Sequence, residues 1–213
     1  TQTPTSFVAD NVTLNPNGTG QYSWNPILDV VSDNNTKKLL IKVLNAADTN
    51  ISDVNNSAAK GQARISSITP GGTSSESYNY GSNITNITWV QDGTLTYTPN
   101  PSLNLIDIRY SRDNFAAEDI SIHTQAPAAG PGSWSPWSTT GLPLSSNYKI
   151  RVQWAADPTV VLGTSANTFR IKALVTASAL SPTTWYVGDT DRVISWTKNP
   201  TTYEDGNLTI SYS

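Results

Sequence analysis

Few residues in this chain combine the type and the spacing that catalysis or metal binding needs. His123 is the only histidine, which excludes a histidine cluster for a metal ion, and no Ser-His-Asp arrangement can be built from it. Two acidic pairs, Glu118 with Asp119 and Asp189 with Asp191, offer oxygen ligands to calcium, but neither lies in a ligand-rich loop. Adjacent strand residues point to opposite faces, so Glu118 and Asp119 cannot flank one glycosidic bond. The sequence therefore predicts no catalytic residue, no metal site, no cofactor and no enzyme.

Asparagines in Asn-x-Ser/Thr sequons are the residues open to N-linked glycosylation. Ser and Thr make up about one residue in four, which gives roughly five sequons by chance, so the observed eight are a mild excess. We expect the glycan acceptors to be among Asn11, Asn17, Asn34, Asn50, Asn55, Asn83, Asn86 and Asn207.

Large aromatic side chains could form a platform on which sugars stack. The candidates are Trp137, Trp154, Trp185 and Tyr186. Packing in the core or between domains is the favoured interpretation, because large apolar rings at repeat junctions stiffen a tandem array. The sugar platform stays as the alternative, which would make the chain a carbohydrate-binding accessory module of a secreted protein.

The composition excludes several classes of partner. The net charge is -3 and no cluster of Lys and Arg occurs, so nucleic acid is an unexpected partner. No apolar stretch approaches the roughly 20 residues that span a bilayer, so we expect no membrane insertion. The chain contains no Cys, which excludes disulfides, zinc-thiolate sites and thiol nucleophiles. No signal-peptide pattern is visible, which indicates a mature product or an internal segment.

The chain repeats itself at a spacing close to half its length. Asn86-Ile87-Thr88-Trp89 recurs as Val193-Ile194-Ser195-Trp196, so that position 89 corresponds to position 196, an offset of 107. The segment 40–48 recurs as 149–157, an offset of 109. We also align Ala63-Arg64-Ile65 with Phe169-Arg170-Ile171 as closing strands. A repeat found at this period decides how the rest of the chain is interpreted.

The order of the repeated segments divides the chain into three parts. Residues 1–64 read as the C-terminal half of a repeat, 65–173 as one complete repeat, and 174–213 as the N-terminal half of another. If Ser213 were followed by Thr1, the two outer parts would form one further repeat. We therefore expect the outer half to be completed by the N-terminal part of the next copy.

Strands with a period of two predict sheets that are buried on one face. Ile106, Ile108 and Tyr110 should face a core while Asp107 and Arg109 face water. A later strand, 148–154, alternates in the same way, and turn formers such as Pro-Gly and Asp-Gly separate the strands. The predicted core residues that carry the repeat signature are Trp89, Trp196, Tyr110, Tyr212, Ile108, Ile210, Val152 and Phe169.

About seven short strands in about 105 residues are typical of an immunoglobulin-like sandwich. The fold prediction is therefore all-β: tandem immunoglobulin-like (Greek-key) β-sandwiches, with one complete and two half domains. No stretch has a 3.6-residue apolar period long enough for a helix.

The same motifs resemble a family of bacterial extracellular tandem immunoglobulin-like repeats found in giant surface and adhesin-type proteins. The resemblance rests on Pro70-Gly71-Gly72, Ile87-Thr88-Trp89, Tyr110-Ser111 and Gly132-Ser133-Trp134, with Trp185-Tyr186-Val187-Gly188 and Ile194-Ser195-Trp196 in the outer part. It implies a stalk, adhesive or fibre role without catalytic residues. The middle repeat departs from the family's Ser-Asp-x-Ser motif and has residues 163–166 there.

Together these features predict a structural repeat unit of an extracellular filament or giant cell-surface adhesin. Its partners would be identical copies arranged head-to-tail, joined covalently or by strand complementation. Surface glycans are a further expected partner, and the expected location is extracellular or on the cell surface.

Overall fold

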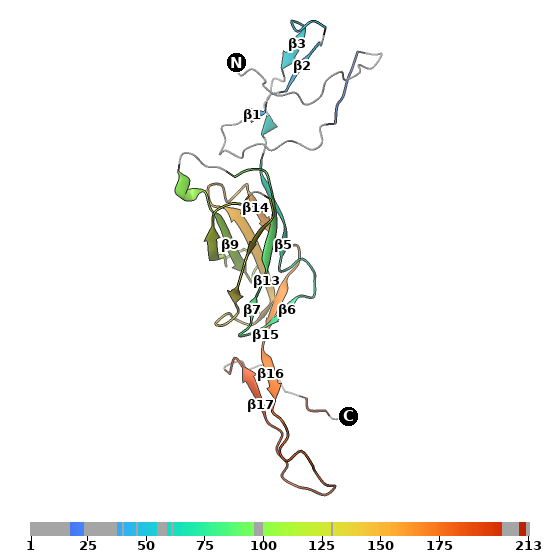
Figure 1. Cartoon of the computed structure of the whole chain (residues 1–213), viewed down its shortest axis with the longest axis vertical. Helices are drawn as coiled ribbons and strands as arrows, with labels where there is room; N and C mark the ends of the chain where they lie inside the picture. Colours follow the sequence, from blue (N-terminus) through green and yellow to red (C-terminus); the bar gives the residue numbers. More distant parts are fainter. Residues whose placement is uncertain are drawn as a thin grey trace.

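The computed structural model describes residues 18–23, 38–39, 41–45, 47–54, 59–60, 62–95, 100–128, 130–201 and 209–211. Regular structure in these ranges consists of β-strands and one short 3-10 helix, η1 (Pro101–Leu103), so the described chain is all-β, as the sequence predicts. None of its helices is long and apolar enough to cross a bilayer. The strands form a central body and separate pairs at either end of it (Figure 1).

The larger sheet of the body has the strand order β10-β9-β13-β15-β6, and β14 also pairs with β13. β10 spans Ile120–Gln125, β9 spans Ile106–Ser111 and β13 spans Ser145–Trp154. β15 spans Phe169–Lys172, β6 spans Ser77–Asn79 and β14 spans Leu162–Thr164. β9 lies along one edge of the long strand β13, and β14 and β15 pair with successive stretches of the other edge. All pairs are antiparallel except β15–β6, which is parallel.

The smaller sheet has the order β11-β8-β5, and β12–β7 form a short pair. In the smaller sheet, β11 spans Gly132–Trp134, β8 spans Ile87–Asp92 and β5 spans Arg64–Thr69. In the short pair, β12 spans Trp137–Ser138 and β7 spans Asn83–Ile84. Gly132 pairs with Trp89, and a Cβ at Gly132 would lie 2.2 Å from the Trp89 ring. Glycine is needed there because the indole lies directly on the backbone of the neighbouring strand.

Both sheets contribute side chains to one core. Ile87 and Trp89 of β8 belong to the same buried cluster as Ile108 of β9 and Ile150 of β13. The Tyr110 ring from β9 also lies 5.4 Å from the Trp137 ring of the short β12–β7 pair. Burial of this many apolar side chains supplies the main driving force for folding. The buried apolar residues are Ala63, Ile65, Ile68, Ile84, Ile87, Trp89, Leu95, Ile106, Ile108, Tyr110, Trp137, Tyr148, Ile150, Val152, Trp154, Val161, Phe169 and Ile171.

The predicted alternation in β9 holds on one face and is wrong on the other. Ile106, Ile108 and Tyr110 are buried as predicted, but Asp107 is also buried, at 8% exposed. Its carboxylate accepts hydrogen bonds from the Ser121 hydroxyl, the Arg109 guanidinium and the Gln153 amide. A buried charge is tolerated when it is paired and hydrogen-bonded, and neighbouring strands provide those partners here.

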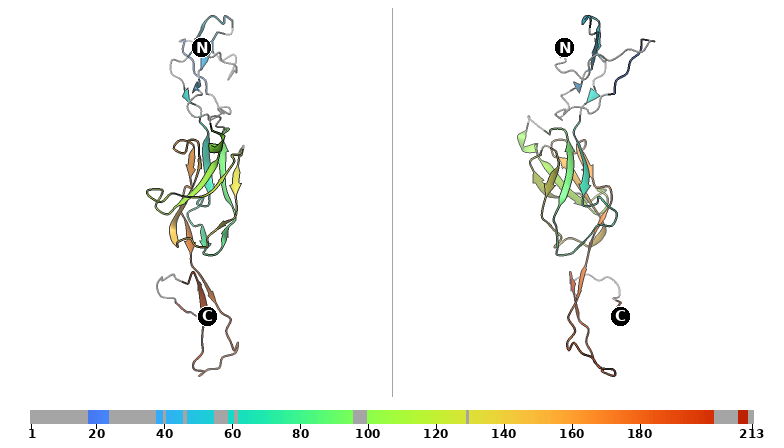
Figure 2. Two further views of the ribbon diagram at one scale, coloured as in Figure 1. Left: turned by 90° about the vertical axis from the view of Figure 1, so that its left-hand side faces the viewer. Right: turned by 45° about the vertical axis from the view of Figure 1, so that its right-hand side comes forward.

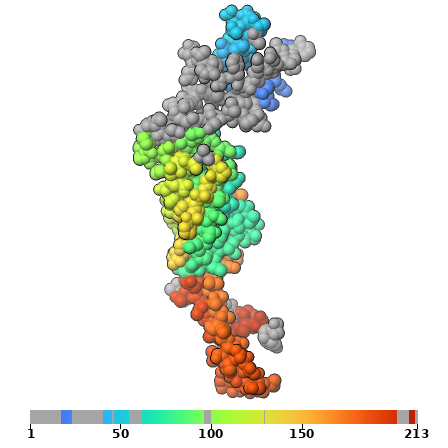
Figure 3. Space-filling view, viewed as in Figure 1, coloured from blue at the N-terminus to red at the C-terminus, as the bar shows by residue number. Residues whose placement is uncertain are grey.

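Three strand pairs lie outside the body. β1 (Lys38–Leu39) pairs with β4 (Ala59–Lys60), and β2 (Lys42–Leu44) pairs with β3 (Ser52–Val54). At the other end, β16 (Leu174–Ala177) pairs with β17 (Trp196–Asn199). The views in Figure 2 place β2–β3 and β16–β17 at opposite ends of the body. Figure 3 shows the C-terminal pair and its connecting loop as a narrow projection.

Candidate assembly interface

The pair β2–β3 has the same register as a strand pair inside the body. Val43 lies opposite Asp53 in β2–β3, and Val152 lies opposite Gly163 in β13–β14. Position 43 thus corresponds to 152, an offset of 109, and position 53 to 163, an offset of 110; both offsets hold throughout each ladder. The offset of 109 agrees with the sequence repeat, so β2–β3 is built as a second copy of β13–β14.

The pair β1–β4 continues this correspondence. Leu39 lies opposite Ala59, as Tyr148 lies opposite Phe169 in the body, so both offsets are the same as in β2–β3. The predicted alignment of Ala63-Arg64-Ile65 with Phe169-Arg170-Ile171 is therefore wrong. Arg64 and Ile65 belong to β5, where they lie opposite Asp92 and Gln91 of β8.

The pair β16–β17 reproduces β5–β8. Val175 lies opposite Lys198 as Ile65 lies opposite Gln91, which gives an offset of 110 for the first strand and 107 for the second. The next residue pair, Thr176 and Thr197, matches Ser66 and Val90. The two ends of the described chain thus carry different strand pairs of the body: β13–β14 and β13–β15 at one end, and β5–β8 at the other.

Apolar side chains that are buried in the body are exposed at the matching outer positions. Val152 is fully buried, whereas Val43 is 69% exposed; Ile65 is 3% exposed, whereas Val175 is 45% exposed. Single exposed apolar residues need no explanation, but rows of them on matched strands do. The exposed large apolar residues of the outer segments are Tyr22, Ile41, Val43, Leu44, Ile51, Leu174, Val175, Leu180, Trp185, Tyr186, Val187, Val193, Ile194, Trp196 and Ile210.

The two outer surfaces correspond to parts that pack together in the body. β14 lies directly against β5 there, since a Cβ on Gly163 would be 2.5 Å from the Ile65 carbonyl oxygen. Asp53 stands at the Gly163 position and Val175 at the Ile65 position. An N-terminal outer surface and a C-terminal outer surface therefore correspond to the two sides of one packing interface. Because Asp53 carries a Cβ that Gly163 lacks, the two outer strands would lie further apart at this point than β14 and β5 do in the body.

Neither a protein-family model nor a curated protein matches the sequence.

The predicted core residues fall into two groups. Trp89, Ile108, Tyr110, Val152 and Phe169 are buried in the body. Their outer counterparts include Trp196, which is 43% exposed, and Ile210, which is 58% exposed, while Tyr212 lies outside the described residues.

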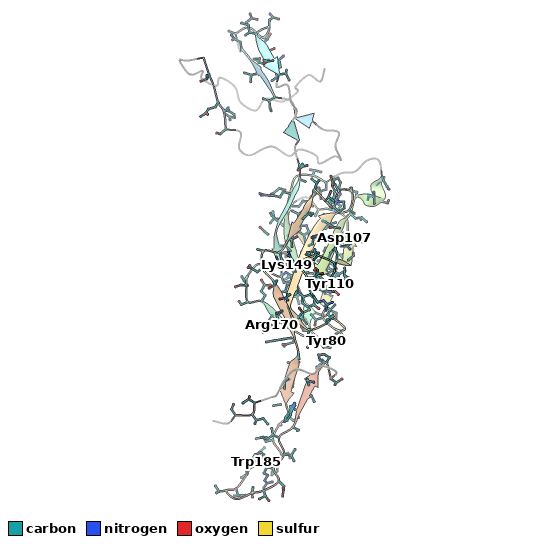
Figure 4. The ribbon with its side chains drawn as sticks, turned by 180° about the vertical axis from the view of Figure 1, so that it is seen from behind. Tyr80, Asp107, Tyr110, Lys149, Arg170 and Trp185 are labelled. Carbon is teal, nitrogen blue, oxygen red and sulfur yellow. The ribbon has the colours of Figure 1, made fainter. Side chains whose placement is uncertain are left out.

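The four aromatic residues considered as a sugar platform are not on one surface. Trp137 and Trp154 lie in the core, at 6% and 0% exposed. Trp185 and Tyr186 lie in the loop between β16 and β17, and Figure 4 shows Trp185 well away from the body. The four rings therefore form no common platform.

Three of the predicted glycan acceptors are described, and all three are exposed. Asn50 lies in the turn between β2 and β3, and Asn83 and Asn86 flank Ile84 on the body. The other five, Asn11, Asn17, Asn34, Asn55 and Asn207, lie outside the described residues.

Three of the four acidic residues considered for calcium, Glu118, Asp119 and Asp189, bind arginines. Glu118 binds the Arg112 guanidinium, which holds the pKa of Glu118 below its usual range. Asp119 binds Arg109 at 2.6 Å and Arg151 at 3.3 Å, and Asp189 binds Arg192. Among the described residues there is no group of three His, Cys, Asp or Glu side chains that could hold a metal ion. These carboxylates therefore brace loops and strands.

Two further local structures have no signal in the sequence pattern. His123 stacks on Trp134 with ring centroids 4.6 Å apart, which joins β10 to β11. Asp113 accepts hydrogen bonds from the Ser111 hydroxyl and from the backbone N–H groups of Ala116, Ala117 and Glu118. These bonds lower the pKa of Asp113 to about 2, because they favour its charged form.

Proposed function

We propose that this chain is a structural repeat unit of an extracellular filament or giant cell-surface adhesin, in which neighbouring copies complete the outer strand pairs. The observation that carries the proposal is the shared register: Val43 and Asp53 match Val152 and Gly163, and Val175 matches Ile65. Strands that repeat the pairing of a packed body, yet expose its apolar face, favour completion by the missing part of the same unit.

We propose that each completed unit is an immunoglobulin-like Greek-key sandwich, with the complete repeat near 65–173. Three features of strand order support this topology. β5, β8 and β11 form one sheet, and β9, β10, β13, β14 and β15 belong to the other. Between β5 and β8 the chain crosses to the larger sheet, where β6 pairs in parallel with β15. This alternation between the two sheets along the chain supports Greek-key connections.

The connection between units supports a stiff, linear array. β15 ends at Lys172 and β16 begins at Leu174, so a single residue, Ala173, links the body to the next unit. So short an extended link allows little bending, and each unit then contacts mainly its neighbours, as in other solenoid-like arrays. Copies could follow one another in one polypeptide or assemble from separate chains, and both arrangements use the same interface.

The extracellular location is part of the proposal. A chain without Cys or Met offers no sulfur to oxidants outside the cell, and three described sequons are exposed. Protease treatment of intact source cells tests it, since a surface protein is cleaved while cytosolic markers survive. Survival of the protein together with those markers would refute the surface location.

Assembly in solution tests the structural role. We expect the purified chain to form head-to-tail oligomers that lengthen with concentration in sedimentation velocity, and rows of beads in electron micrographs. Val43→Asp should prevent this, because it places a charge on the exposed apolar face. Ile120→Asp is the matched control: Ile120 is also exposed, at 41%, but it lies on β10 of the body. A chain that stays monomeric at every concentration, or equal loss of assembly in both variants, would contradict the proposal.

A further inference from the structure

We infer that residues 184–186 of one copy pair in parallel with Lys60 and Gln62 of another copy, so that Thr184 lies opposite Lys60 and Tyr186 lies opposite Gln62. This inference rests on the proposed function and specifies its contact. The segment 184–186 matches β6 (Ser77–Asn79) at the same offset of 107 that relates Trp89 to Trp196. In the body, β6 is the strand that pairs in parallel with β15.

The turn after β6 is already formed at its outer counterpart. The Ser82 N–H donates to the Asn79 carbonyl, and at the corresponding outer positions the Asp189 N–H donates to the Tyr186 carbonyl. Each turn contains a glycine with positive φ, Gly81 at 82° and the glycine that follows Val187 at 93°. Residues 184–186 thus enter the same turn as β6, although in the described chain they pair with no strand.

The β6–β15 ladder indicates which backbone groups would pair. The Arg170 N–H donates to the Glu76 carbonyl, and the Tyr80 N–H donates to the Lys172 carbonyl. A parallel strand bonds through alternate residues, so β6 uses residues 76, 78 and 80. The corresponding outer residues are 183, 185 and 187. The Tyr186 N–H lies outside this set, and it donates to the Asp189 carboxylate.

The partner segment follows from the N-terminal register. β4 matches the start of β15, since Ala59 corresponds to Phe169, and the same offset of 110 relates β5 to β16. Applied to the β6–β15 pairs, these offsets place Thr184 opposite Lys60 and Tyr186 opposite Gln62. Figure 4 shows Tyr80 and Arg170, which flank this contact in the body, at the end nearest β16.

At this contact one position carries a larger residue than in the body and the other carries a smaller one. In the body the Tyr78 ring packs edge-on against Phe169, with centroids 5.8 Å apart. At the junction Trp185 stands at the Tyr78 position and Ala59 at the Phe169 position. The larger ring at the Tyr78 position offsets part of the volume lost at the Phe169 position, and changes that conserve volume are the ones packed interfaces tolerate best. Trp185 is 37% exposed in the single chain and would be covered by the second copy.

Disulfide trapping between two single-cysteine variants tests the register, because the parent chain has no cysteine. We would mix Gln62→Cys with Tyr186→Cys under assembling conditions, oxidise the mixture and measure the covalent dimer. Opposite residues on neighbouring strands lie within the roughly 4.4–6.8 Å Cα separation of disulfides. The control mixes Gln62→Cys with Thr184→Cys, which is displaced by about 6–7 Å along the strand.

We expect severalfold more covalent dimer from the Gln62/Tyr186 mixture than from the control. Equal or greater trapping in the control, while both mixtures still assemble, would overturn the inferred register and leave the proposed function standing. If the parent chain does not assemble, both fall. Sedimentation of each variant before oxidation separates these results, and circular dichroism confirms that each variant is folded.

Discussion

Trp89 and Trp196 occupy matching positions in β8 and β17, yet Trp89 is 2% exposed and Trp196 is 43% exposed. Each strand pairs with an N-terminal neighbour in the same register, so local structure does not account for the difference. What differs is the second sheet. Trp89 lies beneath the larger sheet of the body, whereas no described segment covers Trp196 to the same extent.

This difference predicts that substitution by alanine affects mainly folding stability at Trp89 and mainly assembly at Trp196. Trp89→Ala should lower the free energy of unfolding of the body by about 3–5 kcal/mol, because it leaves a cavity. Trp196→Ala should change it by less than about 0.5 kcal/mol, yet raise the concentration needed for assembly about tenfold or more. Denaturant unfolding and sedimentation measure the two quantities. Trp89→Phe, a milder change, keeps the comparison available if Trp89→Ala does not fold.

Contact between β14 and β5 predicts that Gly163 tolerates no side chain. A Cβ there would lie 2.5 Å from the Ile65 carbonyl oxygen, and backbone cannot move aside cheaply. Gly163→Ala should therefore destabilise the body by about 1–3 kcal/mol. Gly72→Ala is the control, since its nearest neighbour is a Thr69 methyl group at 3.2 Å. Equal denaturation midpoints for the two variants would show that the sheets do not approach this closely.

The loop that holds Asp113 predicts acid sensitivity in a defined range. The pKa of Asp113 is about 2 when folded, below its value of 3.8 without these hydrogen bonds, so the charged carboxylate stabilises the fold above about pH 4. This contribution should disappear as the pH falls from about 4 to about 2. Carbon NMR titration reads the pKa directly. Ser111→Ala, which removes the hydroxyl donor, should raise it, and an unchanged titration would contradict the assigned bonds.

Opposite charges at corresponding positions predict an electrostatic contact between copies. In the body Gly163 lies against Ile65, which lies opposite Gln91; the outer counterparts of Gly163 and Gln91 are Asp53 and Lys198. Asp53→Lys or Lys198→Asp alone should weaken assembly by placing like charges together. A chain carrying both changes should regain it, because the charges are then exchanged. Sedimentation measures each variant, and failure of the double variant to recover would exclude this contact.

Much of the fold was accessible from the sequence because repetition and alternation are local patterns. The offset of 109 found in the sequence is the offset between β2 and β13, and the alternating residues Tyr148, Ile150, Val152 and Trp154 are all buried. The tryptophans at positions 89 and 196 likewise indicated that β8 and β17 are equivalent strands. These signals predict which residues belong together in a unit.

Other features depend on neighbours that are distant in sequence. Asp107 is buried because Ser121 and Gln153 reach it from β10 and β13, which no local pattern in β9 reveals. The Arg-Ile sequence at residues 64–65 resembled that at 170–171, but pairing with β8 assigns the first to a different strand type. The candidate interface is recognised only from the strand registers of β2–β3 and β16–β17 together, because its two sides lie at different ends of the chain.

Amide hydrogen exchange, measured on the same chain in dilute and in concentrated solution, tests the central claim most directly. If neighbouring copies complete the outer strand pairs, protection should rise together in residues 41–54 and 174–199, while the body is unchanged. Trp185 and Val187 should gain the most, because their N–H groups enter the new ladder. Protection that rises at one end only, or at neither end while the chain assembles, would contradict the account.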